Sequence, residues 1–363
     1  MQFILYYVIP FVIVLGILIF VHELGHFLIA KWCNVKVLKF SLGFGPKIIG
    51  KTVGETEYCI SVIPLGGYVK MLGEDSSDEE SEEDPLTSED KLRAFNKQGI
   101  FKRMSIVVAG PMFNFIFAIV VLCGYLILFG SMELSPVIGK VREGAPAEKA
   151  GLINGDMITH INKNPVKIWS DIKTYIEKSP QKEVSVTVNR DNHPLVFHMV
   201  PEESTVQNFF GEAGKSFLIG IEPSGVYIQI DFSLWDGIKT GVDRCMEMTK
   251  LTVLTIIKLF QRVVSIKTLG GPIMIGQITG ELAKNNLLYL LPFMAVISIN
   301  LAVLNLLPIP ILDGGYIFFL FIELIFGKSI SEKGHRISNK IGFYFLLLLM
   351  VIVLYNDILR LFE

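Results

Sequence analysis

The strongest constraint on this chain is a series of long apolar runs, one of which is interrupted by ionisable side chains. Residues 3–21 carry no charged side chain, and after His22-Glu23-Leu24-Gly25-His26 the apolar run continues to Ala30. Further charge-free runs cover residues 104–129, 287–307 and 341–355. Apolar segments of roughly 18 residues or more are typical of transmembrane helices. Hydrophobic residues make up 51% of the chain and charged residues 19%. The sequence therefore predicts a polytopic membrane protein that is mainly α-helical, with about four transmembrane helices.

The charges outside these runs predict an orientation in the membrane. Basic residues follow the first run, precede the second, and separate the third from the fourth: Lys31, Lys36, Lys39 and Lys47; Lys97, Lys102 and Arg103; Lys328, Lys333, Arg336 and Lys340. By the positive-inside rule these flanks are cytoplasmic, and the N-terminus and the segment between the second and third runs lie outside. The first run lacks the basic start and the small-residue cleavage site of a secretory signal, so we interpret it as a retained span.

Shifts in composition divide the chain into four segments. We expect an N-terminal membrane part (1–133), a compact α/β domain (134–222), a helical segment (223–280) and a C-terminal membrane part (281–363). Residues 74–90 hold ten acidic side chains in seventeen positions, which is typical of a solvated, flexible tether. Residues 251–266 are apolar over much of their length but carry Lys258, Gln261 and Arg262, which favours a helix at the membrane interface over a fifth span.

His22-Glu23-Leu24-Gly25-His26 is an H-E-x-x-H motif. On a helix, positions i and i+4 share a face, so both imidazoles can reach one zinc ion, with Glu23 placed to take a proton from a metal-bound water. Zinc lowers the pKa of such a water to about 7. Incidental polar side chains would be costly inside an apolar span, which favours one catalytic Zn²⁺ over a structural interpretation. The four cysteines form no C-x-x-C pair and are interpreted as structural.

A catalytic zinc site needs a third protein ligand, and the candidate is Asp313. It lies in Asn305-Leu306-Leu307-Pro308-Ile309-Pro310-Ile311-Leu312-Asp313-Gly314-Gly315, where two prolines exclude a regular helix and two glycines permit a sharp turn. Irregular backbone at membrane depth is tolerated where protein or a water-filled cavity covers it, which suits a hydrolytic site. The alternative is that Asp313 only caps a helix that starts near Tyr316.

These motifs resemble those of the site-2 protease family of intramembrane zinc metalloproteases, and most of all its bacterial RseP type. The resemblance extends almost from end to end through further motifs in the same order: Phe44-Gly45-Pro46, Pro64-Leu65-Gly66-Gly67-Tyr68-Val69-Lys70-Met71, Ala109-Gly110-Pro111 with Asn114, and Leu269-Gly270-Gly271-Pro272. It implies that His22, His26 and Asp313 bind zinc and that Glu23 is the general base. Asn305 would help to hold the substrate. Asn114 is a weaker correspondence that packing of the second span explains equally well.

The resemblance also implies a function and a location. Such an enzyme hydrolyses peptide bonds within the transmembrane segments of single-pass proteins, such as anti-sigma factors or remnant signal peptides. It would reside in the bacterial cytoplasmic membrane, with the active site toward the cytoplasm. We expect contacts with lipid and no nucleic-acid partner. A PDZ-bearing scaffold with a vestigial metal site is the alternative, and a metal transporter is a third. Glu23 favours the enzyme because neither a scaffold nor a carrier needs a base.

A glycine-punctuated segment after the first span predicts a membrane-associated β-hairpin beside the metal. A transmembrane substrate must unwind before cleavage, and a free strand edge could pair with the unwound chain by β-augmentation. The candidate substrate-binding residues are Gly43, Gly45, Tyr58, Ile60, Val62, Gly66 and Gly67. The alternative is a small sheet that only braces the spans, because exposed strand edges usually need covering.

The segment between the second and third spans resembles a single PDZ domain of the permuted bacterial type. Its marker is Ala150-Gly151-Leu152-Ile153-Asn154-Gly155-Asp156-Met157-Ile158. PDZ domains bind an extended peptide or chain terminus through backbone groups, and here Val137, Ile138 and Gly139 would line the carboxylate-binding loop. The domain could gate access to the active site, or could fold over it without a ligand of its own. Well-known RseP-type proteins carry two tandem PDZ domains, whereas this chain has room for one.

Overall fold

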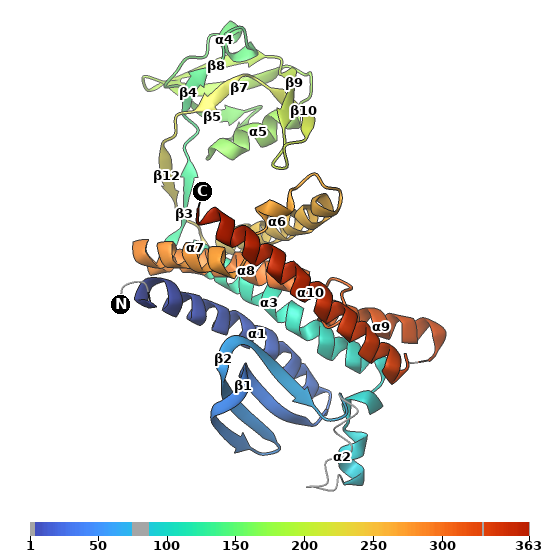
Figure 1. The fold of residues 1–363 in the computed structure, drawn as a ribbon. Helices are drawn as coiled ribbons and strands as arrows, with labels where there is room; N and C mark the ends of the chain where they lie inside the picture. Colours follow the sequence, from blue (N-terminus) through green and yellow to red (C-terminus); the bar gives the residue numbers. More distant parts are fainter. Residues whose placement is uncertain (1–3, 75–86, 329, 363) are drawn as a thin grey trace. The chain divides into compact units, whose positions relative to one another are not determined.

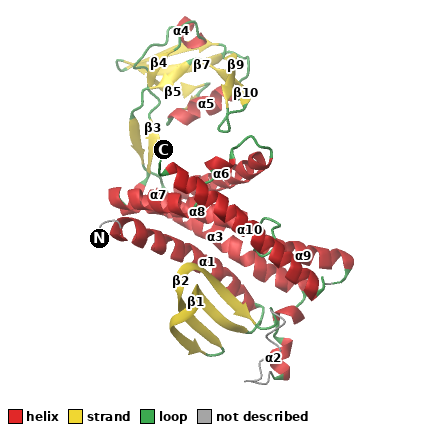
Figure 2. Cartoon of the chain, viewed as in Figure 1, coloured by secondary structure: helices red, strands yellow, loops and turns green. Residues whose placement is uncertain are grey.

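The computed structural model of the protein describes residues 4–74, 87–328 and 330–362. It divides into two compact units (Figures 1 and 2). The membrane unit comprises residues 1–125 and 238–363, and the β-rich unit comprises Leu126–Gly237. Most of the acidic segment predicted as a tether lies outside the described residues.

Among the described residues, four helical stretches are long and apolar enough to cross a membrane, as the sequence predicts. They are Ile4–Trp32, Ile100–Phe129, Leu287–Asn305 and Lys333–Arg360. The corresponding helices are α1 (Ile9–Trp32, preceded by the π-turn η1, Ile4–Val8), α3 (Ile100–Phe129), α8 (Leu290–Asn305) and α10 (Glu332–Arg360). The long helix α6 (Leu234–Phe260) is not among these candidate spans.

Two further helices complete the membrane unit. Helix α7 (Pro272–Asn285) starts at the proline after Gly271, where the missing N–H of proline removes no helical hydrogen bond. Its first turn is fixed by the buried carboxylate of Asp357 on α10, which accepts from the backbone N–H groups of Gly271, Ile273 and Met274. Helix α9 (Asp313–Phe326) precedes α10. The short elements are α2 (Ser88–Leu92), η3 (Phe95–Lys97), η4 (Ile266–Thr268) and η5 (Leu287–Tyr289).

The glycine-punctuated segment after α1 forms a sheet from two long strands, β1 (Val37–Val53) and β2 (Thr56–Met71). Each strand bends, so the start of β2 has partners on both sides: Tyr58 pairs with Phe40 and with Lys51. The end of β2 has a partner on one side only, since Val69 pairs with Phe40 alone. The last residues of β2 are therefore an edge of this sheet, and β2 packs beside α1 (Figure 1).

An ion-pair network fixes the chain after the acidic segment to this sheet. Glu55, at the turn between β1 and β2, accepts two hydrogen bonds from the Arg93 guanidinium, at 2.7 and 2.8 Å, and one from Lys31 at 2.6 Å. The Arg93 and Lys31 cations lower the pKa of the Glu55 carboxyl to about 2, because they stabilise its charged form. The network therefore joins the end of α1, the β1–β2 turn and the segment before η3.

The β-rich unit has the pattern of a small soluble domain. A ribbon of β3 (Ser131–Leu134) and β12 (Tyr227–Ile230) joins it to its neighbours in sequence. Its main sheet has the order β6-β5-β7-β8, and two further pairs are β4 with β11 and β9 with β10. The bounds are β4 Ile138–Val141, β5 Met157–Ile161, β6 Asn164–Pro165, β7 Val184–Arg190, β8 His193–Met199, β9 Glu202–Gln207, β10 Ala213–Leu218 and β11 Ile221–Pro223. Because β3 and β12 pair, the unit extends beyond the predicted 134–222 on both sides.

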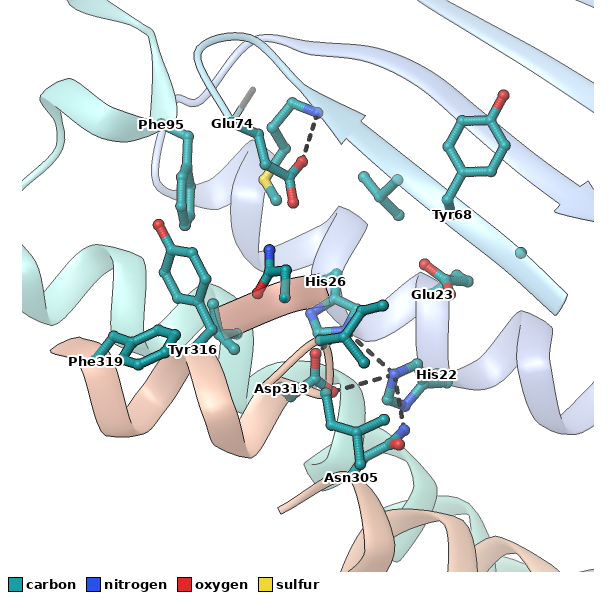
Figure 3. Close-up of a pocket in the computed structure, with 17 residues that line it drawn as sticks. His22, Glu23, His26, Tyr68, Glu74, Phe95, Asn305, Asp313, Tyr316 and Phe319 are labelled. Atoms are coloured by element: carbon teal, nitrogen blue, oxygen red, sulfur yellow. Dashed lines mark hydrogen bonds and ion pairs between the residues drawn. The ribbon is translucent and has the colours of Figure 1, made fainter. Parts of the chain in front are cut away.

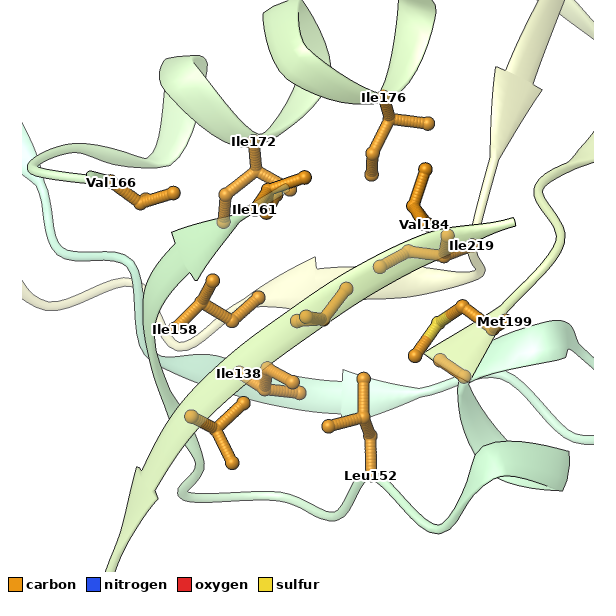
Figure 4. Packing of buried hydrophobic residues seen from close by; sticks show 13 residues of the cluster. Ile138, Leu152, Ile158, Ile161, Val166, Ile172, Ile176, Val184, Met199 and Ile219 are labelled. Atoms are coloured by element: carbon orange, nitrogen blue, oxygen red, sulfur yellow. The ribbon is translucent and has the colours of Figure 1, made fainter. Parts of the chain in front are cut away.

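The helices α4 (Pro146–Ala150) and α5 (Trp169–Glu177) complete this unit. Helix α5 directs Ile172 and Ile176 onto the sheet, where they meet alternate residues of β7 such as Val184 (Figure 4). A buried ion pair closes one end: the Arg190 side chain donates to both carboxylate oxygens of Asp156, at 2.6 and 2.7 Å. Burial by itself would raise the pKa of Asp156. The hydrogen bonds from Arg190 have the larger effect, so the pKa lies below its usual range.

Candidate metal centre and active site

Helix α1 presents two imidazoles on successive turns. His22 and His26 meet edge to face, with ring centroids 4.8 Å apart and Nε2 atoms 3.3 Å apart. Only 14% and 12% of their side chains are exposed. This is the shared helix face that the H-E-x-x-H spacing predicts.

Asp313, from the distant C-terminal part of the chain, lies against both imidazoles. Its Oδ2 is 3.2 Å from Nε2 of His22, and its Oδ1 is 3.5 Å from Nε2 of His26 (Figure 3). Helix α9 begins at Asp313 itself, and the cap position before it is Leu312, which makes no side-chain capping bond. The carboxylate therefore faces the histidines and does not serve as the N-cap of the helix.

The loop between α8 and α9 needs its glycines to present this carboxylate. A Cβ on Gly314 would lie 2.2 Å from the Leu307 carbonyl oxygen, and one on Gly315 would lie 2.4 Å from the Ile309 carbonyl oxygen. Ile311 has a φ of +81°, a left-handed conformation that costs a β-branched residue about 1–3 kcal/mol. The loop and the first turn of α9 thus combine a tight return of the chain with backbone strain next to the Asp313 carboxylate.

The three side chains fit a zinc ion. Their ligand atoms all lie within 4.8 Å of one another, and the three closest approaches are 3.2, 3.3 and 3.5 Å. With zinc–ligand bonds of about 2.0–2.1 Å, a tetrahedral site separates its ligand atoms by about 3.3 Å. Two imidazoles and a carboxylate are also ligand types that zinc accepts in catalytic sites. Three protein ligands leave a fourth position for water or substrate.

Helix α3 forms the wall behind the two histidines. The Ile106 carbonyl oxygen accepts a hydrogen bond from Nδ1 of His26 at 2.8 Å, and the Asn114 side chain is 3.3 Å from Nδ1 of His22. Between them, a Cβ on Gly110 would lie 2.3 Å from Nε2 of His26. Ile106 and Gly110 escaped the sequence reasoning about the site. The sequence Ala109-Gly110-Pro111 could have indicated this contact, because small residues allow two helices to approach closely.

Glu23 lies on the side of the site formed by the edge of β2. Gly67, Tyr68 and Val69 of this strand line the same cavity as Glu23. Gly67 leaves room for it, since a Cβ there would lie 3.0 Å from Cγ of Glu23. The Glu23 carboxylate, the cluster of His22, His26 and Asp313, and a strand edge therefore meet at one place.

A cavity of about 380 Å³ opens at this place (Figure 3). Its lining includes Asn305, whose Nδ2 lies 3.3 Å from Nε2 of His22. A second cavity of about 610 Å³ shares Tyr316, Phe319 and Asn339 with the first. The second cavity is lined by polar groups, including Arg103 and Glu323, so the two together offer a route by which water can reach the metal ligands.

The structure brings some of the predicted substrate-binding residues to the cavity and not others. Gly67 lines it, together with Tyr68, Val69 and Met71 of the same strand. Tyr58 and Ile60 lie in the part of β2 that is paired on both sides, and neither they nor Val62 lines the cavity.

The remaining predicted glycines shape the sheet. Gly43 and Gly45 have φ values of +94° and +85° where β1 bends, and Gly66 packs against the Phe44 ring. The strand edge at the cavity is therefore shorter than the predicted Tyr58–Met71 segment.

In the β-rich unit, the predicted carboxylate-binding loop has its backbone groups occupied. The N–H of Ile138 donates to the Asp156 carbonyl, and the Val137 carbonyl accepts from the N–H of Ser224, at 2.9 and 3.0 Å. The Ile138 side chain is fully buried in the core (Figure 4). Gly139 approaches the Pro223 backbone so closely that a Cβ would lie 2.5 Å from its carbonyl oxygen. The described structure therefore offers no free Ile138 N–H to a ligand carboxylate.

Comparison with known proteins bears on this geometry. The profile of peptidase family M50 matches residues 10–349. The chain belongs to this family. A Clostridium acetobutylicum protein, whose name describes it as a zinc metalloprotease, is 36% identical over 349 residues, covering 96% of each chain. The regulator of sigma-W protease RasP of Bacillus subtilis is 32% identical over 425 residues, covering 98% of this chain and 99% of RasP.

The M50 match establishes this protein as a site-2-type zinc metalloprotease of the membrane. An Agrobacterium fabrum relative named as a zinc metalloprotease is 34% identical over 359 residues, covering 97% of this chain and 95% of its own. Among solved structures, the PDZ domain of an SdrC-like protein from Listeria monocytogenes covers 24% of this chain and 84% of its own, with 22% identity and a TM-score of 0.19.

Proposed function

We propose that this M50 peptidase hydrolyses peptide bonds inside the transmembrane segments of single-pass membrane proteins. The observation that carries the proposal is the convergence of His22, His26 and Asp313 around one point of a membrane-spanning bundle, with Glu23 and a strand edge beside it. The substrates would be anti-sigma-factor-like proteins or remnant signal peptides. The enzyme would lie in the bacterial cytoplasmic membrane with its active site toward the cytoplasm.

The residues of the site divide the reaction between them. His22, His26 and Asp313 would hold zinc, which would supply Lewis acidity and make a bound water acidic enough to attack at neutral pH. Glu23 accepts the proton of the attacking water and returns it to the leaving amine. The side-chain amide of Asn305, which lines the same cavity, donates to the carbonyl oxygen as negative charge develops on it.

The edge of β2 would hold the unwound substrate. A transmembrane helix satisfies its own backbone hydrogen bonds, so the bond to be cut is exposed only when a few residues extend. Gly67, Tyr68, Val69 and Met71 line the cavity, and each pairs with β1 on one side. An extended substrate could add to this edge as a further strand, and pairing at Met71 would displace the bond that its N–H makes to the Glu74 carboxylate. Pairing there would place the scissile carbonyl between Glu23 and Asn305.

The test of this function uses Glu23→Gln in the full-length protein. With a single-pass substrate in liposomes, we expect cleavage to fall at least about 10³-fold while one zinc per chain is retained, because the variant loses the base and keeps the ligands. Cleavage products located by mass spectrometry should map within the apolar segment. Products cut only outside that segment would overturn the intramembrane assignment, and unchanged cleavage would overturn the role of Glu23.

We propose further that the β-rich unit gates access from the outer side of the membrane. In the chain, the strands of this unit lie between α3 and α6, so the domain is inserted between two helices of the membrane unit. Leu134 and Tyr227 are opposed at the end of the β3–β12 ribbon. Replacing residues 135–226 with an Asn-Gly turn would keep the ribbon as a hairpin. Faster cleavage of a substrate with a bulky outer domain supports gating, and an unchanged rate refutes it.

A further inference from the structure

Asn114 is a fully buried polar residue whose side-chain amide is only half satisfied. It is 0% exposed and lies in the middle of α3. Its Nδ2 is placed 3.3 Å from Nδ1 of His22, while its Oδ1 is buried with no hydrogen-bond donor in reach among the described residues. A buried polar atom without a partner costs about 1–3 kcal/mol, so its arrangement requires a reason.

The geometry of His22 shows what Asn114 must offer. Nε2 of His22 faces Asp313 and His26, so that nitrogen carries the lone pair that can bind a metal. In a neutral imidazole the other nitrogen then carries the proton, and Nδ1 must donate. An NH₂ group cannot accept that bond, whereas the amide oxygen can. The two ends of an Asn amide are distinguished only by their hydrogen bonds, so reversing it places Oδ1 against Nδ1–H of His22. The NH₂ group then occupies the position where Oδ1 finds no donor.

Helix α3 also provides an oxygen acceptor for Nδ1 of the second histidine. Nδ1 of His26 donates to the Ile106 carbonyl at 2.8 Å. Ile106, Gly110 and Asn114 follow one another at intervals of four residues, so they lie along one face of α3. That face would provide an oxygen acceptor at each end and a glycine between them where the imidazoles need space.

Asn114 is itself held in place from the opposite side. Its backbone carbonyl accepts a hydrogen bond from Oγ of Ser298 on α8, at 2.8 Å, and both residues are fully buried. This contact joins α3 to the helix that ends at Asn305. The contact uses the backbone of Asn114 only, so removing it leaves the amide side chain available to His22.

We propose that Asn114 is a positioning residue for the metal: its Oδ1 accepts a hydrogen bond from Nδ1–H of His22, fixing the tautomer and the ring orientation in which Nε2 binds zinc. Such partners of metal-binding histidines typically change metal affinity by about 10–100-fold. The inference rests on the metal site of the proposed function but not on its substrate. Its test measures zinc and not cleavage, so the two can fail separately.

The test compares zinc affinity, by chelator competition in detergent, for the full-length protein and three variants. Asn114→Leu removes the acceptor at similar volume, and the dissociation constant for zinc should rise about 10–100-fold. Asn114→Asp keeps an acceptor and no donor, so its affinity should equal or exceed that of the wild type. Ser298→Ala, which removes only the α3–α8 contact, should stay within about threefold.

Two outcomes would overturn the proposal. One is wild-type zinc affinity in Asn114→Leu, and the other is equal loss in the Leu and Asp variants, which would mean that only packing matters. If Asn114→Leu does not fold, ¹⁵N-histidine spectra of the zinc-loaded wild type and Asn114→Asp decide the question. A protonated Nδ1 of His22 whose signal moves in the Asp variant supports the hydrogen bond. An unprotonated Nδ1, or a signal that does not move, refutes it.

Discussion

The two units of the protein differ in how their buried side chains are arranged. In the β-rich unit, thirteen apolar residues form one buried cluster, including Leu152, Ile158 and Val186. In the membrane unit, only 11% of the most apolar window is buried in the first and in the fourth candidate span. The same unit buries polar Asn114, Thr279 and Ser298 completely. One apolar core therefore organises the β-rich unit, whereas the membrane unit combines three smaller apolar clusters with close backbone contacts and buried polar groups.

Glycines allow helices of the membrane unit to approach neighbouring backbone closely. A Cβ on Gly25 of α1 would lie 2.4 Å from the Ala109 carbonyl oxygen of α3, so the two backbones touch at this point. A Cβ on Gly342 of α10 would lie 2.2 Å from the Pro310 carbonyl oxygen. Lipid replaces the apolar partner that a soluble helix would need, and shape complementarity fixes which helices pair.

The largest effect that would test this comparison is expected from Gly110→Ala. The added methyl group overlaps the position of the His26 ring, so we expect cleavage and zinc affinity each to fall by about 100-fold or more. Gly124→Ala on the same helix is the matched control, because nothing lies within 4 Å of its Cβ position. Equal zinc affinity in both variants would show that α3 does not set the positions of the histidines.

The next effect concerns the core of the β-rich unit. Leu152 is 2% exposed in that core, so Leu152→Ala should lower the free energy of unfolding of this unit by about 2–5 kcal/mol. Urea unfolding of the full-length protein, followed by hydrogen exchange in residues 131–230, measures it. Zinc content should not change. A loss of zinc would contradict the separate cores of the two units.

The ion-pair network at Glu55 should make a smaller contribution to the free energy of unfolding, and this contribution should depend on pH. The folded state lowers the pKa of this carboxyl to about 2, so its contribution is complete above the ordinary pKa of about 4.5 and is lost as the pH falls toward 2. Because 29% of the side chain is exposed, we expect about 1 kcal/mol at neutral pH. Thermal melting of Glu55→Gln against the wild type should show a gap that narrows between pH 5 and about pH 2.5. Glu183→Gln, at an exposed carboxylate of the other unit, should show no gap.

The smallest effect on stability is expected from a Leu→Ala substitution in the membrane unit, which matches Leu152→Ala in the β-rich unit. Leu348 of α10 is 61% exposed on the membrane unit, so Leu348→Ala removes contacts with lipid and not with a core. We expect a change below about 0.5 kcal/mol in the unfolding free energy, measured in bicelles. A loss as large as that of Leu152→Ala would mean that another protein surface covers this face.

Much of the fold and the central part of the site could be predicted from local patterns. The four spans follow from uninterrupted apolar runs, and the pairing of His22 with His26 follows from the pitch of a helix. Asp313 could be nominated because prolines and glycines around it exclude a regular helix. The part of β2 that reaches the cavity could not be predicted, because the bends of β1 and β2 decide which segment is left unpaired.

The sequence by itself determined that this chain carries four spans apolar enough for a membrane and that α1 carries two imidazoles on one face with a carboxylate beside them, because hydropathy and helical periodicity are local properties. Only the tertiary structure decided that Asp313 lies against both imidazoles, that the end of β2 forms the edge at the cavity, and that Ile106 and Asn114 lie against the histidines. These are contacts between residues that are far apart in the chain. Their distances depend on how the helices cross, which no local pattern encodes.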